Sequence, residues 1–298
     1  MPIRPRSCHA LFLLTLLAGC LGYRTPMVDP NNGDPAISQA GKGKDARGDG
    51  TQLLAICPVE KRYVLLLGDD GQLYSFGNTN DKYLGLTFKG TVSCGSGGLN
   101  SMTVSPIGPA YISSQSGDLC SVDTRTFKAT RTAFNPLFVG LNSYGMALLP
   151  DTSAAGQTLY ISIKERENSD RPDHLERIDL STFALTDIAY VSPVVPSAEL
   201  TAGPDGELYG FSVGGTESLL LNINPKTASA IDVTKVPAGF AESAFALVYW
   251  QDTFYLFLGD ANANTSSVYR YRKGDTQVPL IGSVNASVIG AGVACAWD

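Results

Sequence analysis

A tight polar turn opens directly into alternating apolar and small residues in the stretch Gly203-Pro204-Asp205-Gly206-Glu207-Leu208-Tyr209-Gly210-Phe211. The stretch Gly68-Asp69-Asp70-Gly71-Gln72-Leu73-Tyr74-Ser75-Phe76 follows the same plan almost position for position. Looser copies place tyrosines at 111, 160 and 255, so the tyrosines at 74, 111, 160, 209 and 255 are 37, 49, 49 and 46 residues apart. Units of this length that are built from short strands indicate a repeat architecture.

Short apolar runs alternate with turn residues about every ten residues from residue 53 onward. This spacing is typical of an all-β sandwich, barrel or propeller, and the repeat length suits the four strands of a propeller blade. Small residues suit innermost strands, which crowd around a central axis. The expected innermost strands are Val64–Leu67, Met102–Ser105, Met146–Leu149, Leu200–Gly203 and Phe245–Tyr249. We therefore predict one all-β propeller of four-stranded blades over residues 53–298.

A shared turn supports this fold. Val122–Thr126, Ile178–Thr182 and Ile223–Thr227 all read aliphatic residue, Asp or Asn, two residues, Thr. Asp or Asn caps such a turn with its own side chain. The pattern resembles the turn between the third and fourth strands of bacterial propeller repeats, including the YVTN-like and PQQ-like families. The resemblance covers most of residues 53–298 and implies a fold, not an activity.

The number of blades is less clear from the sequence than the fold. Five units are visible, Val288–Trp297 resembles a further innermost strand, and Thr51–Val59 reads as an apolar strand. A ring closes best when strands from both ends of the domain share one blade. We predict about five to six blades, with five full units and a shared or incomplete sixth.

The composition places the chain among globular proteins. It has 298 residues, of which 44% are hydrophobic and 17% are charged, as expected for a folded chain. Its formal net charge of −6 disfavours a nucleic-acid binder, which needs a basic surface for phosphates. We therefore expect no nucleic-acid partner.

The first residues have the pattern of an export signal. Arg4 and Arg6 precede a short apolar run, Ala10–Leu17, which ends in small residues. Leu17-Ala18-Gly19-Cys20 resembles the lipobox of bacterial lipoproteins. The resemblance implies that residues 1–19 are a cleaved signal peptide and that Cys20 carries the acyl chains that bind membrane lipid. An ordinary secretory signal that contains a cysteine is the alternative.

The residue after the lipobox cysteine suggests a location. Leu21 stands where an aspartate would retain a lipoprotein in the inner membrane. By resemblance this favours the outer membrane, with the domain facing the periplasm or the cell surface. Residues 20–52 are rich in Gly, Pro, Asn, Asp and Lys without hydrophobic periodicity. They read as a flexible tether with a root-mean-square reach on the order of 30 Å.

Four cysteines remain after the signal and the lipidated residue: Cys57, Cys94, Cys120 and Cys295. An even number in an exported protein indicates disulfides, and four cysteines allow three connectivities. Ring closure would bring Cys57 and Cys295 into the same blade, which leaves Cys94 for Cys120. Free buried thiols are the alternative.

Catalytic and metal-binding motifs are sparse. Beyond the leader the chain has one histidine, His174, and it contains no CxxC pair, P-loop or dinucleotide fingerprint. Acidic residues such as Asp205 and Asp252 precede strands, where they make tight turns. Six-bladed calcium lactonases place carboxylates around a central metal, but no matching set is identifiable here. We expect no cofactor, no metal site and no catalytic residue.

A highly charged segment between two strands of the third unit predicts a surface loop, and a second polar loop should lie on the same face of the disc. The candidate residues for binding other envelope proteins are Lys164, Glu165, Arg166, Glu167, Asp170, Arg171, Asp173, His174, Asp260, Asn262 and Asn264. A solvated charged hairpin without a binding role is the alternative.

Aromatic residues crowd the fifth unit, at Tyr249, Trp250, Phe254, Tyr255, Phe257, Tyr269 and Tyr271. Most should pack between blades, and a minority could stack on a sugar or contact a protein. Taken together, the sequence favours a membrane-anchored, non-catalytic propeller that binds or scaffolds other envelope proteins. The alternatives are a propeller-type metal-dependent hydrolase or lactonase, and a binder of carbohydrate or surface polymer.

Overall fold

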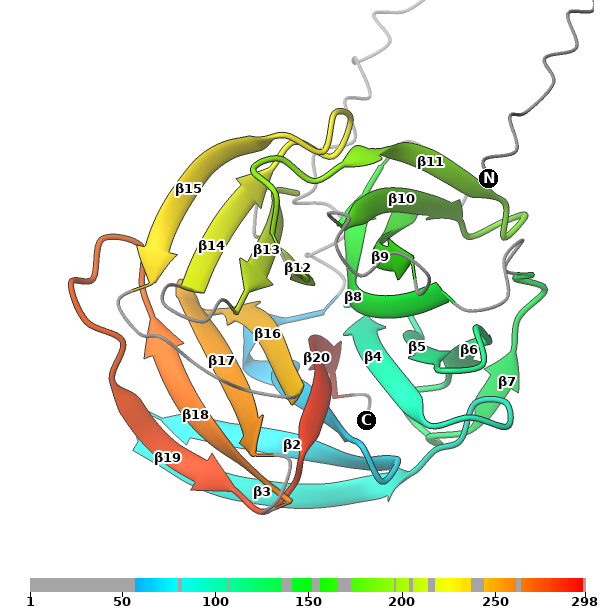
Figure 1. Ribbon diagram of the computed structural model, residues 1–298. Coiled ribbons are helices and arrows are strands. Elements are labelled where there is room, and N and C mark those ends of the chain that lie inside the picture. The colour runs from blue at the N-terminus through cyan, green and yellow to red at the C-terminus, as the bar shows by residue number, and fades with distance from the viewer. Residues whose placement is uncertain are drawn as a thin grey trace, which may run out of the picture. The chain divides into compact units, whose positions relative to one another are not determined.

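Five four-stranded antiparallel sheets stand around a common axis, which makes the domain a five-bladed β-propeller (Figure 1). The computed structural model of the chain describes residues 57–79, 82–106, 108–135, 141–151, 156–165, 173–195, 197–203, 206–213, 218–236, 244–260 and 264–296. The predicted signal peptide, Cys20 and the predicted tether lie outside these residues. Within them, no helix is long and apolar enough to cross a membrane.

The blades are numbered here along the chain, and each is given from its innermost to its outermost strand. Blade 1 contains β20 (Val288–Cys295), β1 (Arg62–Gly68), β2 (Gln72–Thr79) and β3 (Lys82–Thr91). Blade 2 contains β4 (Leu99–Val104), β5 (Ala110–Ser114), β6 (Leu119–Val122) and β7 (Ala129–Arg131). Blade 3 contains β8 (Leu141–Pro150), β9 (Gln157–Glu165), β10 (His174–Asp179) and β11 (Leu185–Tyr190).

Blade 4 contains β12 (Glu199–Ala202), β13 (Leu208–Ser212), β14 (Ser218–Ile223) and β15 (Ala230–Val236). Blade 5 contains β16 (Ala244–Trp250), β17 (Thr253–Asp260), β18 (Thr265–Tyr271) and β19 (Leu280–Val284). A short 3₁₀ turn, η1 (Val59–Lys61), precedes β1.

The innermost strands are crowded, which explains their small residues. β20, β4, β8, β12 and β16 are neighbours around the axis. A Cβ atom added to Gly145 of β8 would lie 2.3 Å from the Ala198 carbonyl oxygen, and one added to Gly290 of β20 would lie 2.4 Å from the Met102 nitrogen. Only glycine allows two backbones to approach so closely.

The hydrophobic core lies between blades, so each sheet is buried on both faces. On β1, Leu65 and Leu67 pack toward Met102 of blade 2, whereas Val64 and Leu66 pack toward Val248 of blade 5. This two-sided burial explains why the strand reads as a continuous apolar run instead of alternating. Each fully buried aliphatic side chain contributes about 1.5–3 kcal/mol of transfer free energy.

The structure confirms four of the five predicted innermost strands and corrects the fifth. Val64–Leu67 belongs to β1, which is the second strand of its blade, because β20 pairs with β1 on the axial side. The prediction failed because a strand buried on both faces has the same composition in either position. Val288–Trp297 was predicted as an innermost strand, and β20 confirms it over the described residues.

The expected sharing of one blade by distant parts of the chain is confirmed, since β20 completes blade 1. No sixth sheet forms among the described residues. The predicted strand at Thr51–Val59 is wrong where it can be compared, because Val59 lies in η1; residues 51–56 lie outside the described ranges.

Both expected disulfides form: Cys57–Cys295 spans 238 residues, and Cys94–Cys120 spans 26.

The shared turn occurs between the third and fourth strands of blades 2, 3 and 4, as predicted. Its second residue caps the turn, because the side-chain oxygen accepts hydrogen bonds from backbone N–H groups two or three residues ahead; these capping residues are Asp123, Asp179 and Asn224. These backbone bonds hold the pKa of the Asp123 carboxyl below its usual range. Four residues after each cap the backbone is left-handed, with φ of 57° at Phe127, 56° at Phe183 and 57° at Ala228.

Candidate functional site

A pocket of about 270 Å³ opens on the propeller axis, at the end where the innermost strands finish. All five blades contribute to this central pocket. Its lining includes Thr103 and Val104 of β4, Leu148 and Pro150 of β8, Thr201 and Ala202 of β12, Val248–Trp250 of β16 and Ala291–Val293 of β20. Most of its walls are formed by packed innermost strands.

The pocket has apolar walls and a few polar groups, a combination typical of binding sites. Arg62 and Asp252 supply charges, and Gln157 supplies an amide. Gln157 Oε1 accepts a hydrogen bond from Ser105 Oγ at 2.8 Å. Arg62 Nε donates to the carbonyl oxygen of Cys57 at 2.9 Å, so the Cys57–Cys295 region also supports the wall.

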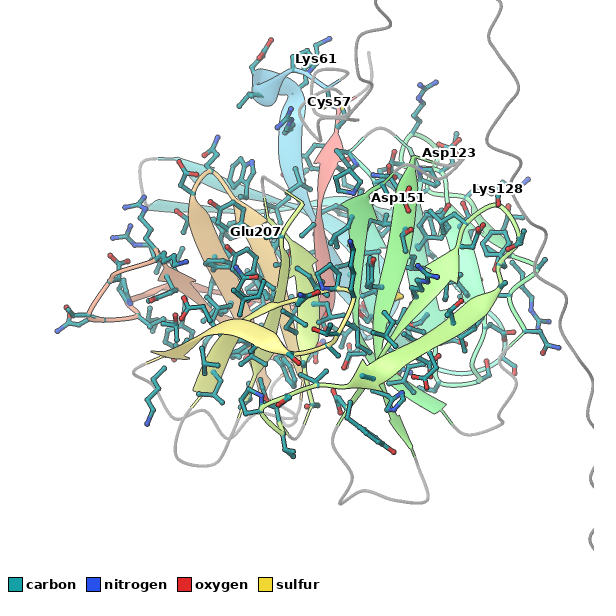
Figure 2. All side chains as sticks on the ribbon, turned by 90° about the horizontal axis from the view of Figure 1, so that it is seen from above. Cys57, Lys61, Asp123, Lys128, Asp151 and Glu207 are labelled. Carbon is teal, nitrogen blue, oxygen red and sulfur yellow. A yellow bond between two sulfur atoms is a disulfide. The ribbon has the colours of Figure 1, made fainter. Side chains whose placement is uncertain are left out.

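The rim is acidic across three successive blades. Asp151, Glu207 and Asp252 lie in or beside the turns that join the first and second strands of blades 3, 4 and 5. Figure 2 shows Asp151 and Glu207 toward the same side of the disc as Lys61 and Cys57. The part of the rim near blade 1 carries both signs of charge, because Glu60 and Lys61 of η1 precede Arg62.

Gln251 and Asp252 form the two-residue hairpin turn between β16 and β17. Both residues are left-handed, with φ of 50° and 57°, as the turns of tight hairpins require. Aspartate tolerates this conformation well, whereas glutamine adopts it less readily. The Tyr249 hydroxyl donates to Asp252 Oδ1 at 3.0 Å and helps to hold the turn.

The aromatic residues of blade 5 divide as expected. Phe254, Tyr255, Phe257 and Tyr271 are at most 3% exposed and pack between blades. Tyr249 and Trp250 line the central pocket instead. Tyr249 stacks on Tyr209 with ring centroids 6.2 Å apart, and Trp250 contacts Tyr255 at 6.1 Å.

A buried carboxyl lies beneath the pocket, and the sequence analysis missed it. Glu199 is 1% exposed, and its Oε1 accepts a hydrogen bond from Ser101 Oγ at 2.9 Å. The bond joins β12 to β4 although β8 separates them around the axis. Glu199 and Ser101 each precede a pocket threonine by two residues. Burial raises the pKa of Glu199 well above its ordinary value. The sequence feature that could have revealed this buried carboxyl is a single Glu at the start of an otherwise apolar strand.

The described residues among those predicted to bind envelope proteins lie at the other end of the disc, because the second strands run opposite to the innermost strands. Asp173 is fully buried, and its Oδ2 accepts hydrogen bonds from Ser162 Oγ and the Ala198 nitrogen. Asp173 is therefore a structural anchor. Asn264 is exposed, and its Oδ1 accepts a bond from the Ser287 nitrogen at 3.2 Å.

The other predicted residues are placed only in part. Lys164 and Glu165 end β9, and Asp260 ends β17. Arg166, Glu167, Asp170, Arg171 and Asn262 lie outside the described residues. His174 begins β10 and contacts Asp187 of β11. The ends of the two predicted loops that are described lie on one face of the disc, as expected, but it is not the face of the central pocket.

Comparisons with known proteins add a fold resemblance. No protein-family model matches the chain, and no curated protein matches it. Among solved structures, the chain resembles one in the crystal structure of a nidogen/laminin complex, with 10% identity and a TM-score of 0.49. The match covers 78% of this chain and 98% of that one. The propeller assignment rests on the strand topology itself.

Proposed function

We propose that this chain is a membrane-anchored envelope lipoprotein whose propeller binds other envelope proteins at the central pocket. The observation that carries the proposal is the pocket itself, with apolar walls from five blades and a charged rim. Protein interfaces concentrate their binding energy in a few anchor side chains that fill such pockets. The acidic rim of blades 3 to 5 favours a partner segment with an apolar or aromatic anchor flanked by basic residues.

The membrane anchor is the part of the proposal that rests on sequence alone. Signal removal after residue 19 and acylation of Cys20 would leave residues 20–52 as the spacer between membrane and propeller. Metabolic labelling with a fatty-acid analogue tests this step. We expect label in the wild-type protein, none in Cys20→Ser, and release of that variant from the outer-membrane fraction. Label that persists in Cys20→Ser would contradict the anchor.

Site-specific photocrosslinking tests which face binds. Gln251 beside the pocket and Asn264 on the opposite face both belong to blade 5, are exposed, and have left-handed backbones with φ of 50° and 46°. A photoreactive amino acid at either position therefore meets a similar backbone cost. We expect crosslinks to a small, reproducible set of envelope proteins from position 251 and few from position 264.

Comparison of positions 251 and 264 shows which face of the disc binds the partner. Crosslinks confined to position 264 would move binding to the opposite face, where the sequence placed it. Crosslinks at neither position, with the protein present in the membrane at wild-type amounts, would contradict the protein-binding proposal.

A carbohydrate or surface-polymer ligand is the second candidate, because Tyr249 and Trp250 line the pocket beside Asp252. Aromatic side chains next to hydrogen-bonding groups suit the alternating apolar and polar faces of a sugar. Glycan-array binding that is lost in Trp250→Leu, while its unfolding midpoint stays near wild type, would favour this candidate. The metal-dependent hydrolase has less support, since Asp252 is the carboxylate among the described lining residues of the pocket.

A further inference from the structure

Blade 3 brings a histidine and two carboxylates together in its outer half. His174 and Glu176 are two residues apart on β10, so their side chains leave the same face of the sheet. A register shift after Leu175 places Asp187 of β11 opposite Glu176. One possible ligand atom from each of the three lies within 4.8 Å of the other two.

The imidazole is already oriented by its neighbours. His174 Nδ1 lies 2.6 Å from Asp187 Oδ1, and the ring meets Tyr190 edge-on with centroids 4.1 Å apart. The His174 side chain is 22% exposed and that of Asp187 is 65% exposed, so a hydrated ion can reach the group. Asp187 Oδ1 and His174 Nδ1 are therefore already close enough for both to bind one ion, and the Tyr190 ring limits how far the imidazole can turn.

The charges of this group are poorly balanced without a cation. Glu176 and Asp187 face each other across the strand pair, and like charges in this position are destabilising. Glu176 Oε2 is buried and has no hydrogen-bond partner among the described residues. On β9, the residues paired with His174 and Glu176 are Ile163 and Ile161, which supply no positive charge. A bound cation would satisfy the buried oxygen and remove the repulsion.

We propose that His174, Glu176 and Asp187 bind one divalent transition-metal ion of the zinc class. One imidazole and two carboxylates are ligand types that zinc accepts, and three protein ligands leave a fourth position for water. The imidazole disfavours Ca²⁺ and Mg²⁺, which prefer oxygen ligands. Binding replaces the contact between Nδ1 and Oδ1 by bonds to the ion and links the third strand of blade 3 to its outer strand. The sequence indicated no metal site because only strand pairing brings Asp187 to the other two residues.

Zinc titration of the chelator-treated full-length protein, purified without a histidine tag, tests the proposal. Calorimetry should show one equivalent of Zn²⁺ bound. At a free Zn²⁺ concentration 100-fold above the dissociation constant, the thermal unfolding midpoint should rise by roughly 5–10 °C. Co²⁺ should give a visible absorption spectrum that reports nitrogen and oxygen coordination.

Variants identify the ligands. Asp187→Asn and His174→Gln should each weaken Zn²⁺ binding by about tenfold or more, with an unchanged circular dichroism spectrum, because both side chains are partly exposed. Asp232→Asn is the matched control: Asp232 lies on β15, the outer strand of blade 4, and its side chain is 50% exposed. It should keep wild-type affinity. Absence of stoichiometric Zn²⁺ binding, equal affinity in both ligand variants and wild type, or preference for Ca²⁺ would each overturn the proposal.

Discussion

Blades 1 and 4 contain almost the same nine-residue stretch but use it differently. In blade 4, the turn of Gly203–Phe211 joins the innermost strand β12 to β13, on the pocket face. In blade 1, the turn of Gly68–Phe76 joins the second strand β1 to β2, at the opposite end of the disc. The repeated pattern thus specifies a hairpin and not its place in the blade.

The two blades also differ in how they are assembled. Blade 4 is one continuous segment, 199–236, whereas blade 1 takes its innermost strand from residues 288–295. Local turns hold blade 4 together, and long-range pairing plus the Cys57–Cys295 disulfide holds blade 1 together. The stability of the closed ring should therefore be more sensitive to changes in blade 1.

The largest effect is expected from removing the closure disulfide. In the chain-entropy model, a bond that spans 238 residues stabilises the fold by about 5 kcal/mol. The double variant Cys57→Ala/Cys295→Ala should lose stability of that order in chemical denaturation. Loss of less than about 1 kcal/mol would show that strand pairing alone closes blade 1.

Removal of the second disulfide, Cys94–Cys120, should reduce the unfolding free energy by less than removal of the closure disulfide. Cys94→Ala/Cys120→Ala opens a loop of 26 residues, for which the same model gives about 3.5 kcal/mol. We expect the same measurement to rank this variant between wild type and the closure variant. A reversed ranking would contradict the view that ring closure is the more demanding constraint.

A glycine of blade 1 and a glycine of blade 4 should differ in how much a substitution by alanine destabilises the fold. In Gly290→Ala the new Cβ would meet Met102 backbone at 2.4 Å, whereas in Gly210→Ala of blade 4 it would meet the end of the Ile223 side chain at 2.8 Å. A side-chain tip can move and a backbone cannot, so Gly290→Ala should cost roughly 1–3 kcal/mol and Gly210→Ala less. Equal losses in the unfolding free energy would contradict this explanation of the crowded inner ring.

The smallest effect concerns pH and blade 4. The folded-state pKa of Glu199 is raised by burial, so folding favours its protonated form. That stabilisation is complete below the unfolded pKa of about 4.3 and is lost as pH rises through the folded-state pKa, by at most about 1.4 kcal/mol per pH unit. Glu199→Gln should flatten this decline while Ser101 keeps an oxygen to donate to. Parallel stability–pH curves for the two proteins would refute the assignment.

Most of the fold could be predicted from the sequence, because local signals determine it. Turn residues, strand lengths and the Asp or Asn caps indicated the hairpins. The even number of cysteines indicated disulfides, and the ring-closure argument indicated their pairing. The order of strands within blade 1 could not be predicted, because Val64–Leu67 is apolar for either position. Local signals carry no information on which face of the disc a strand end reaches.

The candidate site was harder to predict than the fold. The central pocket assembles two or three residues from each of five separate strands, and no linear motif marks Thr103, Thr201 or Ala291. Trp250 was noticed only for its aromatic ring. Glu199 and the group around His174 depend on contacts across strands, which the sequence does not reveal without knowledge of the register.

The pairing of β1 with β20 has a consequence for the order in which the strands of the ring form during synthesis. β1 emerges first among the described strands but cannot acquire its axial neighbour until β20 has emerged, after the other nineteen. Until then the apolar edge of β1 is open and Cys57 can react with Cys94 or Cys120. The unfinished ring therefore keeps an open strand edge and unpaired thiols until β20 has been made, and we expect chaperones and disulfide isomerases to limit the yield of the protein more than its translation rate does.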